Sequence, residues 1–100
     1  MSLDSPNLDR LVHEPARLLL MASLAVVRDA DFVHLLAQTG LTKGNLASHM
    51  DKLEQAGYVQ IEKTFVDKMP RTLYRLTRKG RRALRIYRKA MLDLLRGLPA

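Results

Sequence analysis

The chain has 100 residues, no cysteine, 17 Lys and Arg against 10 Asp and Glu, and a formal net charge of +7. This length accommodates a single domain, residues 1–100, with a modest core. The absence of cysteine excludes disulfides, thiolate metal sites and cysteine redox sensing within these residues. The apolar run at residues 18–27 is too short to span a bilayer.

The charge is distributed unevenly along the chain. Residues 1–57 contain 5 Lys and Arg and 7 Asp and Glu, whereas residues 58–100 contain 12 and 3. A concentrated positive region attracts polyanions, although a solvated basic face also keeps a protein soluble. The first residues lack the basic start, apolar run and cleavage site of a secretory signal, so we expect a soluble cytoplasmic protein with no membrane contact.

The N-terminal part predicts a flexible start followed by two helices. Residues 1–8 are mostly polar and include a proline, so we expect them to be flexible. Pro15 suits the first position of a helix over residues 15–28, because its missing N–H is no loss there. This helix is apolar nearly all round, which predicts cover on more than one side. Asp31 is a suitable cap for a second helix at residues 32–38.

Residues 41–59 contain the stretch around which the chain is organised. Thr42 is a suitable N-cap for a helix at residues 43–56, and Gly57 suits its end because glycine adopts a left-handed conformation freely. Three apolar residues recur at helical spacing on one face: Leu46, Met50 and Leu53. The other side is polar and basic, with Lys43, Asn45, Ser48, His49 and Lys52.

A short helix with one apolar face and one face rich in hydrogen-bond donors is typical of the second helix of a helix-turn-helix. The polar face would then enter the DNA major groove. The alternative is an ordinary amphipathic surface helix, because single motifs carry false-positive risk. A β-hairpin directly after the helix favours DNA recognition.

That hairpin is predicted from two strand-like stretches, residues 58–64 and 72–76, with residues 65–71 near its tip. We expect Pro70 to break strand pairing, since proline lacks an N–H for the ladder.

The last helix, residues 78–96, has one apolar and one basic face. Thr77 is a suitable N-cap, and the helix is longer than the core of one small domain needs. The basic residues fall within an arc of about 120° on a helical wheel: Arg78, Arg82, Arg85, Arg88, Lys89 and Arg96. The apolar residues partly follow a heptad spacing, which predicts a homodimer through the first and last helices, with interface residues Leu11, Leu18, Leu84, Tyr87, Met91, Leu94, Leu95 and Leu98. The alternatives are a monomer whose last helix folds back on its own domain, and a basic membrane-surface segment.

The predicted fold class is mainly α with a small β-hairpin (α+β), arranged as a winged helix-turn-helix with an extended C-terminal dimerisation helix. The chain resembles the MarR/ArsR-like winged-helix transcriptional regulators, in particular their compact DNA-binding domains. The resemblance covers most of residues 11–87 and rests on the stretches 13–18, 41–59, 62–65, 70–77 and 80–81. It implies sequence-specific DNA binding, usually as a homodimer that represses or activates transcription.

The predicted DNA interface combines the recognition helix, residues 43–56, with the wing, residues 59–77. The helix would enter the major groove, and the wing would contact the backbone or minor groove. The candidate residues are Thr42, Lys43, Gly44, Asn45, Ser48, His49, Lys52, Lys63, Lys68, Arg71 and Arg75. Arg71 is the best minor-groove candidate, with an ion pair to Asp67 as the alternative. A two-fold dimer predicts an inverted repeat with half-sites about 10 bp apart.

Other functions have little support in the sequence. The three histidines share no ligand spacing, so no metal site is predicted. No Gly-x-Gly loop and no catalytic constellation occurs, which indicates a non-enzyme without a cofactor. Two alternatives stay open: a winged-helix protein–protein interaction module, and an RNA-binding winged helix, which usually relies on stacking aromatics. The sequence does not identify the operator, the target genes, the sign of regulation or a small-molecule effector.

Overall fold

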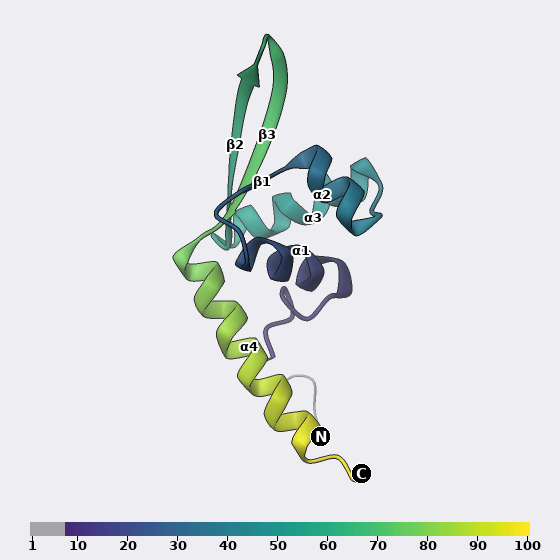
Figure 1. The fold of residues 1–100 in the computed structure, drawn as a ribbon. Coiled ribbons are helices and arrows are strands. Elements are labelled where there is room, and N and C mark those ends of the chain that lie inside the picture. Colours follow the sequence, from purple (N-terminus) through teal and green to yellow (C-terminus); the bar gives the residue numbers. More distant parts are fainter. Residues whose placement is uncertain (1–7) are drawn as a thin grey trace.

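The computed structural model describes residues 8–100, which form four helices and a three-stranded antiparallel sheet of order β1-β3-β2 (Figure 1). This α+β winged helix confirms the predicted fold class. The elements in chain order are α1 (Pro15–Ala25), β1 (Ala30–Asp31), α2 (Phe32–Thr39), α3 (Lys43–Gln55), β2 (Val59–Val66), β3 (Met69–Leu76) and α4 (Arg78–Arg96).

The helices begin where the sequence supplies caps. The side chains of Asp31, Thr42 and Thr77 each accept a hydrogen bond from a backbone N–H in the first turn of the helix that follows, as predicted. Glu14 does the same for α1, a cap that we did not predict because Pro15 alone marked the start. These bonds satisfy donors that a helix start leaves unpaired.

The core lies between α1, α2, α3 and the base of the hairpin. The three apolar residues of α3 are fully buried, as their spacing predicted. They join a cluster that also contains Val12, Leu20, Met21, Leu24, Leu35, Val59, Tyr74, Leu76 and Tyr87. Leu8 belongs to this cluster as well and is only 4% exposed, so it is not part of a flexible start. Residues 1–7 of that predicted flexible segment lie outside the described residues.

The first helix ends at Ala25, three residues earlier than predicted. The guanidinium of Arg81 on α4 donates to the backbone carbonyls of Ala25 and Val27, at 3.0 and 3.5 Å. These bonds satisfy carbonyls at and just after the end of α1. The sequence of α1 alone does not indicate that Arg81 provides them. The chain then forms β1, which we did not predict because two residues carry no strand periodicity.

The hairpin is longer than predicted, and its tip is not a loop. Pro70 pairs with Phe65 in the ladder, so our expectation that Pro70 breaks strand pairing was wrong. β1 pairs with β3 only at Leu73 and Tyr74. At Pro70, β3 therefore has a free edge that tolerates a missing N–H. The hairpin, which we call the wing, projects well beyond the helices (Figure 1).

A close contact joins α4 to the base of the wing. The Thr77 hydroxyl donates to the Gly57 carbonyl at 2.6 Å, and the Thr77 N–H donates to the Tyr58 carbonyl at 3.0 Å. A Cβ at Gly80 would lie 2.1 Å from the same Tyr58 oxygen. Only glycine therefore fits at this crossing, beyond which α4 runs away from the wing (Figure 1).

Candidate nucleic-acid interface

The polar face of α3 is open to solvent beside the wing. Thr42 accepts a hydrogen bond from the Asn45 N–H at 3.1 Å, which orders the start of the helix. The following candidate residues are exposed on or just before α3: Thr42, Lys43, Gly44, Asn45, Ser48 and Lys52. Small and amide side chains on an exposed helix face allow close approach to base edges.

His49 does not lie on this open face. Its side chain is 20% exposed, and its Nδ1 lies 3.6 Å from Glu14 Oε2 and 3.2 Å from Arg17 Nη1. His49 follows the buried Leu46 by three residues, which brings it to the margin of the packed face of α3. In the structure His49 therefore ties α3 to the start of α1 and does not point towards the predicted groove.

The charges around Glu14 favour its ionised form. Partial burial acts to raise the pKa of Glu14, but hydrogen bonds from the backbone N–H groups of Arg17 and Ala16, with the charges of His49 and Arg17, hold this pKa below its ordinary value of 4.5. The Arg17 side chain also donates from Nε to the Leu11 carbonyl at 2.6 Å. This network fixes how α3 sits on α1.

Two acidic residues of α3, Asp51 and Glu54, were not among our candidates. Both are exposed and line a groove of about 550 Å³ between α3 and the wing, opposite Lys63 and Thr72. Asp51 follows Ser48 at helical spacing, so the periodicity that we used for the basic residues could have identified it. With Lys43 and Lys52, they leave α3 without net charge from Lys, Arg, Asp and Glu.

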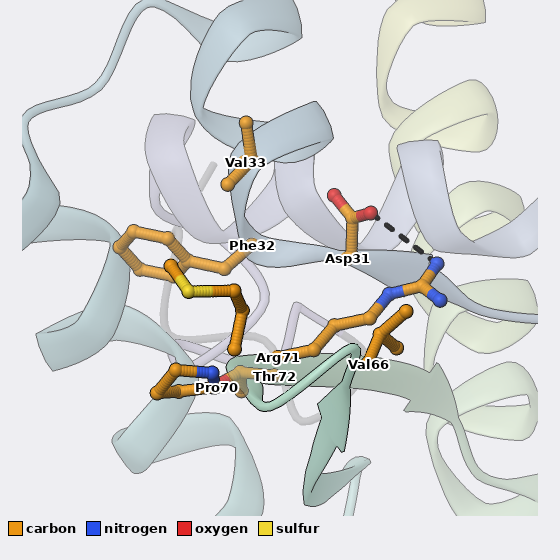
Figure 2. Close-up of a pocket in the computed structure, with 8 residues that line it drawn as sticks. Asp31, Phe32, Val33, Val66, Pro70, Arg71 and Thr72 are labelled. Atoms are coloured by element: carbon orange, nitrogen blue, oxygen red, sulfur yellow. Dashed lines mark hydrogen bonds and ion pairs between the residues drawn. The ribbon is translucent and has the colours of Figure 1, made fainter.

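The arginines of the wing are drawn back towards the body of the domain. Arg71 lies 3.4 Å from Asp31 Oδ2, and Arg75 lies 3.4 Å from Asp29 Oδ2. Figure 2 shows the Arg71 side chain extended towards Asp31 at the start of α2. The alternative pairing of Arg71 with Asp67 is therefore replaced by a pairing with Asp31. Lys63 and Lys68 are exposed on the wing.

Eight of the 17 Lys and Arg residues of the chain lie on α4. This helix contains eight Lys and Arg and one Asp, a surplus equal to the net charge of the whole chain. Six of these basic residues are exposed on the predicted arc: Arg78, Arg82, Arg85, Arg88, Lys89 and Arg96. Lys89 and Arg96 share Asp93, at 2.8 and 3.3 Å. Within residues 8–100, Arg82 and Arg85 form no hydrogen bond or ion pair.

An apolar groove runs between α1 and α4, on the side of α4 away from the basic arc. Its volume is about 350 Å³, and it is lined by Leu18, Ala22, Ala25, Leu84, Tyr87, Arg88, Met91 and Leu92. The predicted interface residues Leu11, Leu18, Leu84, Met91 and Leu94 are half-buried against the core. Tyr87 is buried and shares a 2.6 Å hydrogen bond with His13 Nδ1. Leu95 and Leu98 are exposed.

Neither a metal site nor a membrane segment is found in the described part of the chain. Residues 8–100 contain no group of three His, Cys, Asp or Glu side chains arranged to hold a metal ion. Over the same residues, none of the helices combines the length and the hydropathy needed to cross a bilayer.

The chain is similar to a family of DNA-binding domains and to solved proteins described as transcriptional regulators. Residues 16–95 match the family described as winged helix DNA-binding domain. The solved transcriptional regulator homologue protein from Pyrococcus horikoshii OT3 is 36% identical, with a TM-score of 0.76 over 87% of this chain and 89% of that chain. A PadR family transcriptional regulator from Eggerthella lenta DSM 2243 is 30% identical, with a TM-score of 0.65 over 79% and 76%. An uncharacterized protein from Methanocaldococcus jannaschii is 29% identical over 89 residues, covering 89% of this chain and 97% of that protein.

Proposed function

The chain belongs to the winged helix DNA-binding domain family, and on that premise we propose that it is a homodimeric transcriptional regulator that binds double-stranded DNA in a sequence-specific manner. The observation that carries this proposal is the open polar face of α3 beside a projecting wing. The finer MarR/ArsR-like assignment stays a prediction from the sequence.

In the proposed complex, α3 lies in the major groove. Asn45, Ser48 and Lys52 contact base edges, since an amide pairs well with adenine and lysine with guanine. Thr42 and Lys43 lie at the start of the helix near a phosphate, and Gly44 leaves room for the backbone to approach. His49 acts indirectly, by positioning α3 through Glu14 and Arg17.

The wing lies along the adjacent backbone or minor groove. Lys63 and Lys68 are free to meet phosphates. Arg71 and Arg75 reach DNA only if their weak exposed ion pairs open, which costs little free energy. The wing arginines are therefore secondary contacts in this proposal.

The proposed dimer interface is the apolar groove between α1 and α4, with the exposed apolar residues at the end of α4. The same patch on a second copy covers this groove through a two-fold axis. The interface residues, together with those that pack directly behind them, are Leu11, Leu18, Leu84, Tyr87, Met91, Leu94, Leu95 and Leu98. Two copies then present two α3 helices to an inverted repeat with half-sites about 10 bp apart.

The two alternative functions have less support. An RNA-binding surface usually offers several aromatic side chains for stacking. All five aromatic residues lie within residues 8–100, and only Phe65 is exposed. A protein-interaction module would be expected to have an apolar or acidic recognition face, whereas the open face of α3 is polar and its two acidic residues are balanced by two lysines. We propose no enzymatic activity and no cofactor, and a cytoplasmic location.

A selection experiment tests the proposal. The purified chain is incubated with random-sequence duplexes, and the recovered pool is compared with scrambled duplex, single-stranded DNA and single-stranded RNA in gel shifts at several salt concentrations. We expect one inverted repeat that outcompetes the scrambled duplex, and a dimeric mass by light scattering. Equal binding to all duplexes, or tighter binding to RNA, contradicts the proposal.

A further inference from the structure

The strand residues next to the turn of the wing are apolar and exposed, although the wing projects well beyond the neighbouring helices (Figure 1). Phe65 is 72% exposed and Met69 is 67% exposed, and Val66 and Pro70 are exposed beside them. Keeping such side chains in water forgoes the free energy that burial provides. A cluster of apolar side chains at an exposed tip marks a contact surface more often than a single exposed residue does.

The tip is also thin and geometrically fixed. Phe65 pairs with Pro70, and Val66 pairs with Met69, directly before a turn in which Asp67 and Lys68 both have positive φ. Two residues with positive φ form the tight hairpin turn whose twist matches that of the strands. Beyond β1 the wing is only two strands wide, about 5 Å between strand axes.

Phe65 and Pro70 lie on the face of the wing that is turned towards α3, further out along the strands. Side chains alternate between the two faces of a strand, so Phe65 shares its face with Lys63 and Ile61. Lys63 and Ile61 line the groove opposite Ala47 and Asp51 of α3, together with Thr72 of β3. DNA held against α3 would therefore run along this face and meet Phe65 at its end.

Met69 has a different environment. It lines a hollow of about 300 Å³ between the wing tip and α2, together with Phe32 and Val33. Figure 2 shows Phe32 and Val33 on the α2 side of this hollow and Pro70 and Arg71 on the wing side. Phe65 does not line the hollow, and at 72% it is the most exposed of the large apolar residues at the tip.

The charges of the tip fit a polyanion. The strand positions that share the face of Phe65 carry Lys63 and no acidic residue, because Glu62 lies on the opposite face. In the turn beyond them, the acidic Asp67 is matched by the basic Lys68. The arginine expected at the tip, Arg71, is instead held by Asp31. On this face of the wing, the side chain nearest the turn is therefore an aromatic ring with a lysine behind it.

We propose that Phe65, backed by Pro70, enters the DNA minor groove as an apolar wedge that partly separates two stacked base pairs and bends the duplex. This inference rests on the proposed function. The minor groove is about 6 Å wide, which excludes a helix or a whole two-stranded ribbon but admits single side chains inserted from the tip. Apolar wedges of this kind partly unstack a base step and kink the duplex, while flanking cations hold the phosphates.

The test uses the full chain and a duplex recovered by selection, with 2-aminopurine at successive steps of the flanking minor groove. Unstacking raises 2-aminopurine fluorescence, and circular-permutation gels report the bend. For the wild type we expect a fluorescence rise at one step in each half-site and a bent duplex. Phe65→Ala should lose both signals and bind roughly tenfold more weakly, whereas Phe65→Leu should keep most of each because leucine also serves as a wedge.

Val66→Ala is the matched control, because Val66 is exposed on the same strand but on the other face. It should leave fluorescence, bend and affinity unchanged. The salt slope of binding should stay the same in Phe65→Ala, since no phosphate contact is lost. Circular dichroism verifies that each variant is folded.

Three outcomes would overturn the wedge. Phe65→Ala with wild-type affinity and bend overturns it and leaves the proposed function standing. A change in dimer mass with no change in DNA bending shows that the tip contacts protein instead. A wild-type chain that binds no duplex at any salt concentration removes the proposed function itself, and the wedge with it.

Discussion

Helices α3 and α4 are both amphipathic and both capped by threonine, yet they distribute charge in opposite ways. α3 has two basic and two acidic residues, whereas α4 has eight basic residues and one acidic residue. α3 is packed between α1 and the wing, whereas α4 runs out of the domain, away from the wing (Figure 1). A charge surplus attracts a polyanion at long range, but a neutral face with varied donors and acceptors discriminates between bases. In our proposal the two tasks are therefore carried by different helices.

The largest loss of stability is expected from disrupting the close contact between α4 and the segment that links α3 to the wing. Gly80→Ala introduces a Cβ 2.1 Å from the Tyr58 carbonyl oxygen, so that the backbone of α4 or of the wing must shift. We expect a loss of about 3 kcal/mol in the free energy of unfolding, the upper range for overpacking. Urea titration measures it. Gly44→Ala, where nothing lies within 4 Å of the added Cβ, is the control. Equal stability of the two variants would contradict the close crossing.

The dimer is tested on the apolar side of α4. Met91→Glu places a charge in the groove between α1 and α4 and should yield a monomeric mass in light scattering at micromolar concentration. Loss of the second half-site contact should weaken operator binding by about 100-fold. Ile86→Glu is the matched control, because Ile86 is exposed and lies outside this groove. An unchanged mass for Met91→Glu in a folded protein would favour the monomer.

The reading face of α3 is tested by comparing two neighbours on the helix. Asn45→Ala should cost about 2 kcal/mol of operator binding and relax the base preference at one position. His49→Ala should lower stability through loss of the link to Glu14, without changing any base preference. Selection from randomised half-sites measures both. A relaxed base preference in His49→Ala would instead indicate that His49 contacts the bases directly.

The smallest effect is expected from α4 charges. The double variant Arg82→Gln/Arg85→Gln removes two exposed cations that have no partner within residues 8–100. We expect association with DNA to slow several-fold at low salt and to match the wild type at high salt, because screening removes the long-range attraction. Stopped-flow fluorescence measures the rates. An unchanged low-salt rate would make this basic face a solvated surface with no part in encounter.

Local chemistry let the sequence determine much of this protein. Each of three predicted caps accepts its hydrogen bond, and the buried stripe of α3 follows from a spacing of three and four residues. The order of helices and strands then limits the fold to a winged helix, because few arrangements bury these faces together. Glycine and proline positions marked several boundaries for the same local reason.

Tertiary structure decided what local spacing leaves open. β1 exists because β3 offers it a partner, and Pro70 is tolerated because β3 has a free edge there. His49 and Arg71 are polar residues at predicted groove positions, yet each finds a charged partner more than 30 residues away, Glu14 or Asp31. Sequence periodicity cannot predict such partners, because it indicates only the direction in which a side chain points and not the residues that it contacts. The apolar wing tip became apparent only when folding had drawn Arg71 back and left Phe65 exposed.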